Sequence, residues 1–154
     1  MTRSLALVVS LGLAACAGSG ASAPSPETPA LPYVAIRPED ARLAAAASDL
    51  QARVGHDLNY EVDAEVLKDH APNLQDELAE AFESIARGLE KAREENPEGV
   101  AKTTAVVRTI RVELDEKTRD FRARVAGDVL YLYVPTHTPG FTTDAAVRAA
   151  LTAN

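Results

Sequence analysis

The spacing of apolar residues changes near residue 96, and this change constrains the fold more than any other feature. From about Pro72 to Glu95 apolar residues recur every three or four positions, which predicts one long amphipathic helix with a single buried face. The buried positions of this helix are Leu74, Leu78, Ala81, Phe82, Ile85, Leu89 and Ala92. Asn96, Pro97 and Gly99 end it. Beyond them apolar and polar residues alternate, which is typical of strands.

Three strands are expected in this second part, at Ala105–Leu114, Phe121–Val125 and Val129–Val134. A polar turn separates the first two, and the tight-turn dipeptide Gly127-Asp128 separates the last two. Such short connections predict a three-stranded antiparallel meander. The segment from Asp128 to Val134 is apolar on both faces apart from its tyrosine hydroxyls, so it is the best candidate for a central strand.

The remaining elements are a helix over Pro38–Val54, a strand over Leu58–Asp63 and a short C-terminal helix over Asp144–Leu151, capped by Thr142 or Thr143. Asp63 can also cap a short helical turn that follows it. The expected fold class is α+β: the meander and one further strand, packed by two longer helices and the short C-terminal helix.

Residues 1 to 15 have the layout of a cleaved secretory signal peptide. Arg3 precedes an apolar run, Leu5 to Ala15, that ends in small residues. A helix needs about 20 apolar residues to cross a bilayer, so this run is too short for a membrane span.

The residues at the end of that run, Leu13, Ala14, Ala15 and Cys16, resemble the lipobox of bacterial lipoproteins. The resemblance implies cleavage before Cys16, with Leu13, Ala14 and Ala15 recognised by the peptidase, and covalent lipid on Cys16. It further implies a protein of the bacterial cell envelope whose membrane contact is this lipid. In a Gram-negative host, Ala17 after the cysteine favours the outer membrane. The open alternative is an ordinary signal peptide cut nearby, with Cys16 a free thiol.

Residues 16–32 are rich in Gly, Ala, Ser and Pro and read as a flexible linker, and residues 33–154 are long enough for one globular domain. The whole chain has a net charge of −7, which disfavours nucleic acid as a partner. The expected partners are therefore the membrane, through the lipid, and an envelope protein.

Several arginines gather on the predicted meander, and antiparallel pairing would place Arg111 and Glu113 beside Arg122 and Arg124. Two interpretations stay open. The arginines form ion pairs on a solvated face, or Arg111, Arg122 and Arg124 form a strip that binds an anionic small ligand.

The rest of the sequence supplies no catalytic or metal-binding motif. His56, His70 and His137 are not spaced as metal ligands, and no serine stands in a nucleophile elbow. The sequence therefore predicts no catalytic residue, no metal and no cofactor.

A second resemblance rests on the order of elements over residues 58 to 151. A strand reading LNYEVD, a long helix, strands ending VLYLYVP and a further helix are similar to the first half of zincin-like peptidase domains. In that family the helix after the strands carries HExxH, which binds zinc and supplies the general base. Here it reads DAAVRAALTAN, without His or Glu. The resemblance implies a truncated or inactive N-terminal part of a metallopeptidase, as the alternative to a lipid-anchored protein with a non-enzymatic interaction or structural role.

Overall fold

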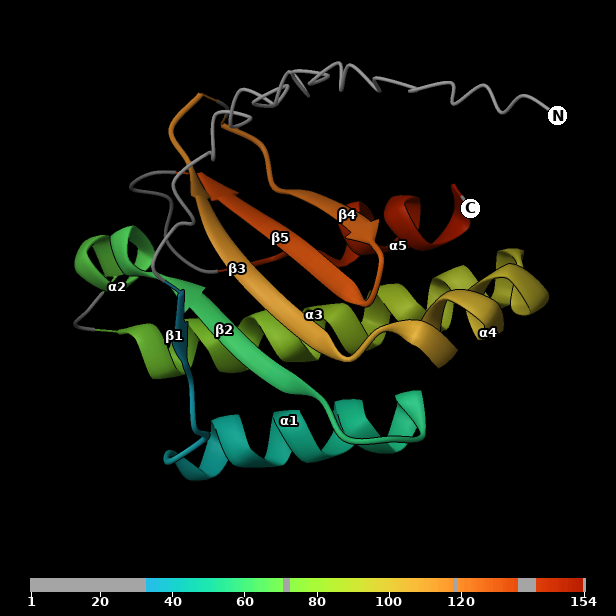
Figure 1. Ribbon diagram of the computed structural model, residues 1–154, viewed down its shortest axis with the longest axis horizontal. Helices are drawn as coiled ribbons and strands as arrows, with labels where there is room; N and C mark the ends of the chain where they lie inside the picture. Colours follow the sequence, from blue (N-terminus) through green and yellow to red (C-terminus); the bar gives the residue numbers. More distant parts are fainter. Residues whose placement is uncertain (1–32, 71–72, 118, 136–140, 154) are drawn as a thin grey trace, which may run out of the picture. The chain divides into compact units, whose positions relative to one another are not determined.

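The computed structural model describes residues 33–70, 73–117, 119–135 and 141–153, and in them a five-stranded sheet carries helices on one face (Figure 1). The elements in chain order are β1 (Tyr33–Ala35), α1 (Ala41–Val54), β2 (Asn59–Asp63), α2 (Ala64–His70), α3 (Leu74–Glu95), α4 (Pro97–Val106), β3 (Thr109–Asp115), β4 (Arg122–Ala126), β5 (Val129–Pro135) and α5 (Asp144–Thr152). The expected mixture of helices and strands is confirmed.

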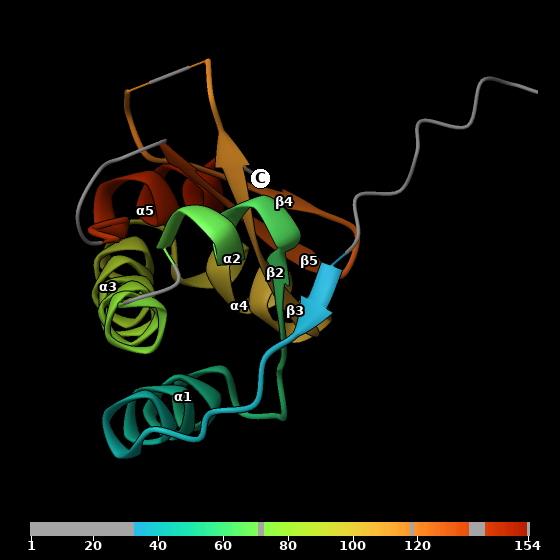
Figure 2. The same ribbon diagram turned by 90° about the vertical axis from the view of Figure 1, so that its left-hand side faces the viewer.

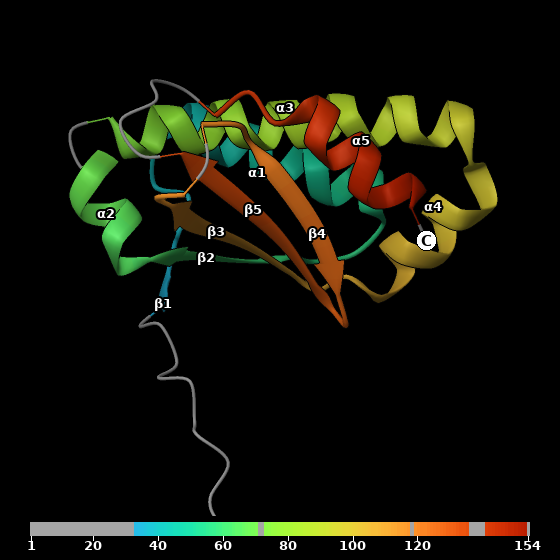
Figure 3. The same cartoon turned by 90° about the horizontal axis from the view of Figure 1, so that it is seen from above.

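The strand order in the sheet is β1-β2-β3-β5-β4. β2, β3 and β5 run parallel to one another, while β1 and β4 lie at the two edges and run antiparallel to their neighbours. Helices α1, α3 and α5 lie side by side against one face, and no described helix covers the other (Figure 2). Seen from above, α2 and α4 flank the two ends of the sheet (Figure 3).

The expected antiparallel meander is wrong, because β5 lies between β3 and β4. β3 pairs with β5 in parallel, from Thr109 opposite Val129 to Asp115 opposite Pro135. The apolar sequence of β5 explains why β5, and not β4, lies next to β3: the strand richest in Leu and Val is buried between two neighbours. β4, which carries Arg122 and Arg124, takes the edge instead.

Two elements were not expected from the sequence. α4 begins directly after α3, with Pro97 in its first turn and the Asn96 side chain accepting a hydrogen bond from Gly99 N at 3.0 Å. Its buried positions, Val100, Thr103 and Thr104, follow helical spacing, although β-branched residues favour strands. Residues 105 and 106, expected in a strand, therefore end this helix.

The second unexpected element is β1, which pairs antiparallel with β2, with Val34 opposite Val62. It has only three residues, which is too short for alternation to be recognised in the sequence.

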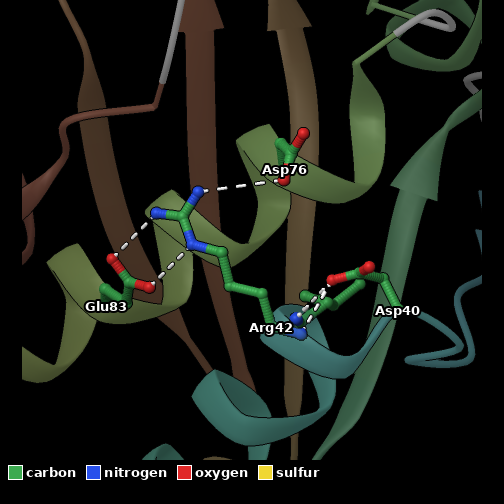
Figure 4. A network of polar contacts seen from close by, with 5 residues as sticks. Asp40, Arg42, Asp76 and Glu83 are labelled. Carbon is green, nitrogen blue, oxygen red and sulfur yellow. Dashed lines mark hydrogen bonds and ion pairs between the residues drawn. The ribbon is translucent and has the colours of Figure 1, made fainter.

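Side chains at the start of α1 fix this helix to α3 (Figure 4). Asp40 caps α1 by accepting hydrogen bonds from the backbone N–H groups of Arg42 and Leu43. The Arg42 guanidinium then reaches α3, where Nε lies 3.1 Å from Glu83 Oε1 and Nη1 lies 3.8 Å from Asp76 Oδ1. The hydrogen bond and charge of Glu83 raise the pKa of Arg42 above its usual value.

The core fills the space between the three helices and the covered face of the sheet. Leu58, Tyr60 and Val62 are buried together, as the alternation around β2 predicts, and Tyr60 packs on Phe82 with ring centroids 4.5 Å apart. Burial raises the pKa of Tyr60 to about 12.

The close approach of α3 and α5 depends on a glycine. A Cβ on Gly88 would lie 2.6 Å from the backbone oxygen of Asp144 and 3.1 Å from the Cβ of Val147. The hydroxyl of Ser84, also on α3, accepts a hydrogen bond from Thr143 N at 2.7 Å. α5 is therefore seated on α3 through small side chains.

Candidate functional site

The structure places all three arginines of the predicted strip on the uncovered face of the sheet, together with tyrosines. Across the strands Arg111 on β3 lies opposite Tyr131 on β5, and Tyr131 lies opposite Arg124 on β4. In the next row Tyr133 lies opposite Arg122. The arginine–tyrosine face is defined here as Tyr33, Arg111, Arg122, Arg124, Tyr131 and Tyr133.

The expected neighbour relation within the strip is wrong, because β5 separates the arginines of β3 from those of β4. Arg111 and Glu113 do not pair with Arg122 and Arg124 directly; a column of tyrosines stands between them. Arg111 and Arg124 therefore meet tyrosine rings, and the one ion pair between β3 and β4 among the described residues joins Arg122 to Asp115 at the end of β3.

Arg111 is held on three sides. Its Nε and Nη2 donate hydrogen bonds to one carboxylate oxygen of Glu61 at 2.8 and 2.6 Å. Its guanidinium carbon lies 4.0 Å from the ring centroid of Tyr33 and 5.4 Å from that of Tyr131. Burial alone would lower the pKa of Arg111, but the hydrogen bonds and charge of Glu61 outweigh it and hold the pKa above its usual value.

Tyr33 closes this side of the face by donating a short hydrogen bond to Glu113 on β3. Burial and the neighbouring Glu113 carboxylate raise the pKa of Tyr33 above its usual value. The contact joins β1, at one edge of the sheet, to the strand in its middle.

The two arginines of β4 are far more accessible than Arg111. Arg122 is more than half exposed and pairs with Asp115, which is itself buried. Arg124 forms no ion pair with any described residue. Its guanidinium lies 5.0 Å from the Tyr131 ring centroid and donates to the Tyr133 hydroxyl at 3.3 Å.

Tyr131 and Tyr133 present ring faces between the arginines. Their planes lie within 9° of parallel, and their centroids are 6.2 Å apart. Aromatic faces and guanidinium planes together bind partners that combine a flat or apolar group with an anionic one. From the sequence alone these tyrosines are expected in a strand, with no part in a site. Their alternation with buried Leu130 and Leu132 is the signal that they lie on the uncovered face.

His56 and His70 make their contacts away from this face. His56 contacts the backbone oxygen of Thr104 at 3.0 Å. His70 is buried, with Nδ1 2.7 Å from Glu77 and its ring edge against Phe141. In the part of the chain that the structure describes, no three His, Cys, Asp or Glu side chains converge as a metal site. The other predicted site, Leu13, Ala14, Ala15 and Cys16, lies outside the described residues, as does His137.

No protein family, curated protein or solved structure matches the chain. No helix within the described ranges is long and apolar enough to cross a membrane.

Proposed function

We propose that this chain is a lipid-anchored protein of the bacterial cell envelope with a non-enzymatic role, and that it binds an anionic partner on the arginine–tyrosine face. The observation that carries the proposal is the position of this face: it is the side of the sheet that no described helix covers.

The chemistry of the arginine–tyrosine face suits a binding site better than a surface that only stabilises the fold. Its polar and aromatic side chains stand on β1, β3, β4 and β5, which hold them at fixed spacing without loops. Arg124 has no carboxylate partner among the described residues, so an anion from a partner can approach it without displacing one.

The net charge of the chain limits where an anionic partner can bind. The chain carries a net charge of −7, so anions are repelled at a distance and are attracted only where the arginines of β4 are close. A partner that presents carboxylates to the arginines of β4 suits this surface, whereas nucleic acid is disfavoured.

Placement in the envelope rests on the lipobox-like residues Leu13 to Cys16 and on the linker of residues 16–32. A lipid on Cys16 would hold the chain to the membrane, and the linker would leave the face free to meet another envelope component.

The proposal is tested by titrating the lipid-free protein, begun at residue 17, with poly-glutamate at low and at physiological salt. The double variant Arg122→Gln/Arg124→Gln is expected to bind at least about tenfold more weakly than wild type, with a smaller salt dependence. Arg148→Gln, which removes an exposed guanidinium on α5, is the matched control and is expected to leave binding unchanged. Equal binding by all three proteins would refute the proposed site.

A further inference from the structure

β4 ends the sheet, and its outer edge has no strand beside it in the described ranges. An edge strand exposes backbone N–H and C=O groups in a row, which is a ready template for a further strand. β4 has five residues, Arg122–Ala126, which is close to the usual length of a strand in such pairings.

Side chains on β4 alternate between the two faces of the sheet. Arg122 and Arg124 point to the uncovered face, whereas Ala123 and Val125 are partly buried against the core. A hollow of about 500 Å³ is lined by Arg122, Ala123, Arg124 and Tyr133, so there is open space directly at this edge.

We propose that an extended acidic segment of a partner protein adds to the sheet beside β4, with carboxylates at alternate positions facing Arg122 and Arg124. Backbone hydrogen bonds to the free edge hold the segment, and the two arginines select its sequence. This inference rests on the proposed function and names the partner class for it: an extended acidic peptide rather than a small anion.

Charge decides against a second copy of this chain as the occupant. A two-fold antiparallel pairing of β4 with itself about its central residue would place Arg124 opposite Arg124 of the second copy. Like charges directly opposite one another in a ladder are destabilising, whereas a carboxylate at the same place forms a favourable cross-strand pair.

The opposite edge of the sheet lacks these features. β1 has three residues, and its tyrosine is engaged by Glu113. It carries no arginine or lysine, so it offers an acidic strand no charge to pair with. The two edges therefore serve as an internal comparison within one molecule.

The test uses the isotope-labelled lipid-free protein and a synthetic peptide of about eight residues, with Glu at every second position and Thr or Val between. Backbone amide shifts on β4 are expected to move on binding, those of β1 are not, and β4 amides that exchange fast are expected to become protected. Arg124→Gln is expected to weaken binding about tenfold and Arg148→Gln to leave it unchanged.

Two control peptides separate the edge from the face. A peptide of the same composition with its glutamates in one block is expected to bind more weakly. A peptide with alternate backbone nitrogens methylated keeps its carboxylates but loses strand donors, so it is expected not to bind. Binding of the methylated peptide equal to that of its parent would overturn strand addition while leaving the proposed function intact. Absence of binding by the alternating peptide at about 1 mM would also overturn strand addition. If poly-glutamate also failed to bind, the proposed function would fall with it.

Discussion

Single residues of the arginine–tyrosine face divide into those that hold it together and those that remain accessible. Arg111 is enclosed by Glu61, Tyr33 and Tyr131, whereas Arg124 is exposed and touches only tyrosines. A guanidinium with hydrogen bonds and stacked rings contributes to stability, while an exposed one contributes little.

This division predicts losses of stability of different size for two substitutions. Arg111→Lys keeps the positive charge but loses the planar stacking and one hydrogen bond to Glu61, so it should lower the free energy of unfolding by about 1 kcal/mol. Arg124→Gln should change it by less than about 0.5 kcal/mol. Urea unfolding followed by circular dichroism measures both, and a larger loss for Arg124→Gln than for Arg111→Lys would contradict the assignment.

A second prediction for a single residue concerns Gly88, which lies where α3 and α5 approach closely. Alanine is favoured over glycine inside a helix by about 1 kcal/mol, so a solvent-exposed glycine replaced in this way would stabilise the protein. At Gly88, however, the new Cβ would lie 2.6 Å from a backbone oxygen of α5. Overpacking of this kind costs about 1–3 kcal/mol, so Gly88→Ala should lower the thermal midpoint and increase hydrogen exchange in α5. A raised midpoint would show that the two helices separate easily.

Asp144 gives a prediction about pH. The hydrogen bond from Lys91, at 2.8 Å, lowers the pKa of Asp144 below its usual value of 3.8, and the position at the start of α5 favours the charged form as well. Because the folded pKa is below the unfolded one, the ion pair stabilises the fold at neutral pH. This stabilisation is lost as the pH falls through the lowered pKa.

The measurement is the Asp144 carboxyl chemical shift across an acid titration. Its midpoint should lie below 3.8 in wild type and return toward that value in Lys91→Met. At neutral pH, Asp144→Asn should cost about 0.5–1 kcal/mol of unfolding free energy. A wild-type midpoint at or above the usual value would mean that Lys91 does not hold this carboxylate in solution.

At the scale of helices and strands, elements with strong periodicity could be predicted from the sequence. α3 begins and ends close to the expected bounds because its apolar stripe is long. β2 was recognised by its alternation of apolar and polar residues, and α5 by the helical spacing of its apolar residues. The pairing of the strands could not be predicted, because a hairpin between β4 and β5 leaves open which of the two lies next to β3. The apolar sequence of β5 already favoured an interior place, and a simple meander would have given that place to β4.

The candidate site could be predicted only in part, because it also depends on the order of the strands. The alternation of Arg122 with Ala123 and Arg124 shows that two arginines share a face. That Arg111 meets them across a column of tyrosines, and that Tyr33 joins from an edge strand, depends on strand order and on an element too short to recognise.

Strand order has a measurable consequence in hydrogen exchange. β3 and β5 each have neighbours on both sides, whereas β1 and β4 have one. Amides of Ile110, Val112 and Leu132 should therefore exchange only through global unfolding, and those of Val34 at least about tenfold faster through local opening. Fast exchange in β5 with slow exchange in β4 would indicate that the antiparallel meander is right after all.

At the scale of the whole described fold, the helices cover only one face of a sheet that contains parallel strands. Parallel sheets are usually covered on both faces, and their strands are then apolar on both sides. Here the uncovered side of β2 and β3 carries Glu61, Arg111 and Glu113. The sequence is thus adapted to water or a polar partner on that side, and the exposed face is a feature of the sequence rather than a missing layer.

The proposed lipid anchor is independent of this fold and is tested separately. If Cys16 carries the lipid, Cys16→Ser should remove the lipid from the intact mass, because serine has no thiol to form the thioether. Without acyl chains the protein should move from the membrane fraction to the soluble fraction. The domain of residues 33–154 does not contain Cys16, so its unfolding midpoint and its binding of acidic peptides should be unchanged. Arg3→Gln, which leaves Leu13, Ala14, Ala15 and Cys16 intact, is the control and should keep the lipid.

A Cys16→Ser protein that still sediments with membranes would show that another part of the chain, or a membrane-bound partner held on the arginine–tyrosine face, retains it. The double variant Arg122→Gln/Arg124→Gln in the Cys16→Ser background separates those two cases, because only attachment through the face is lost with the arginines.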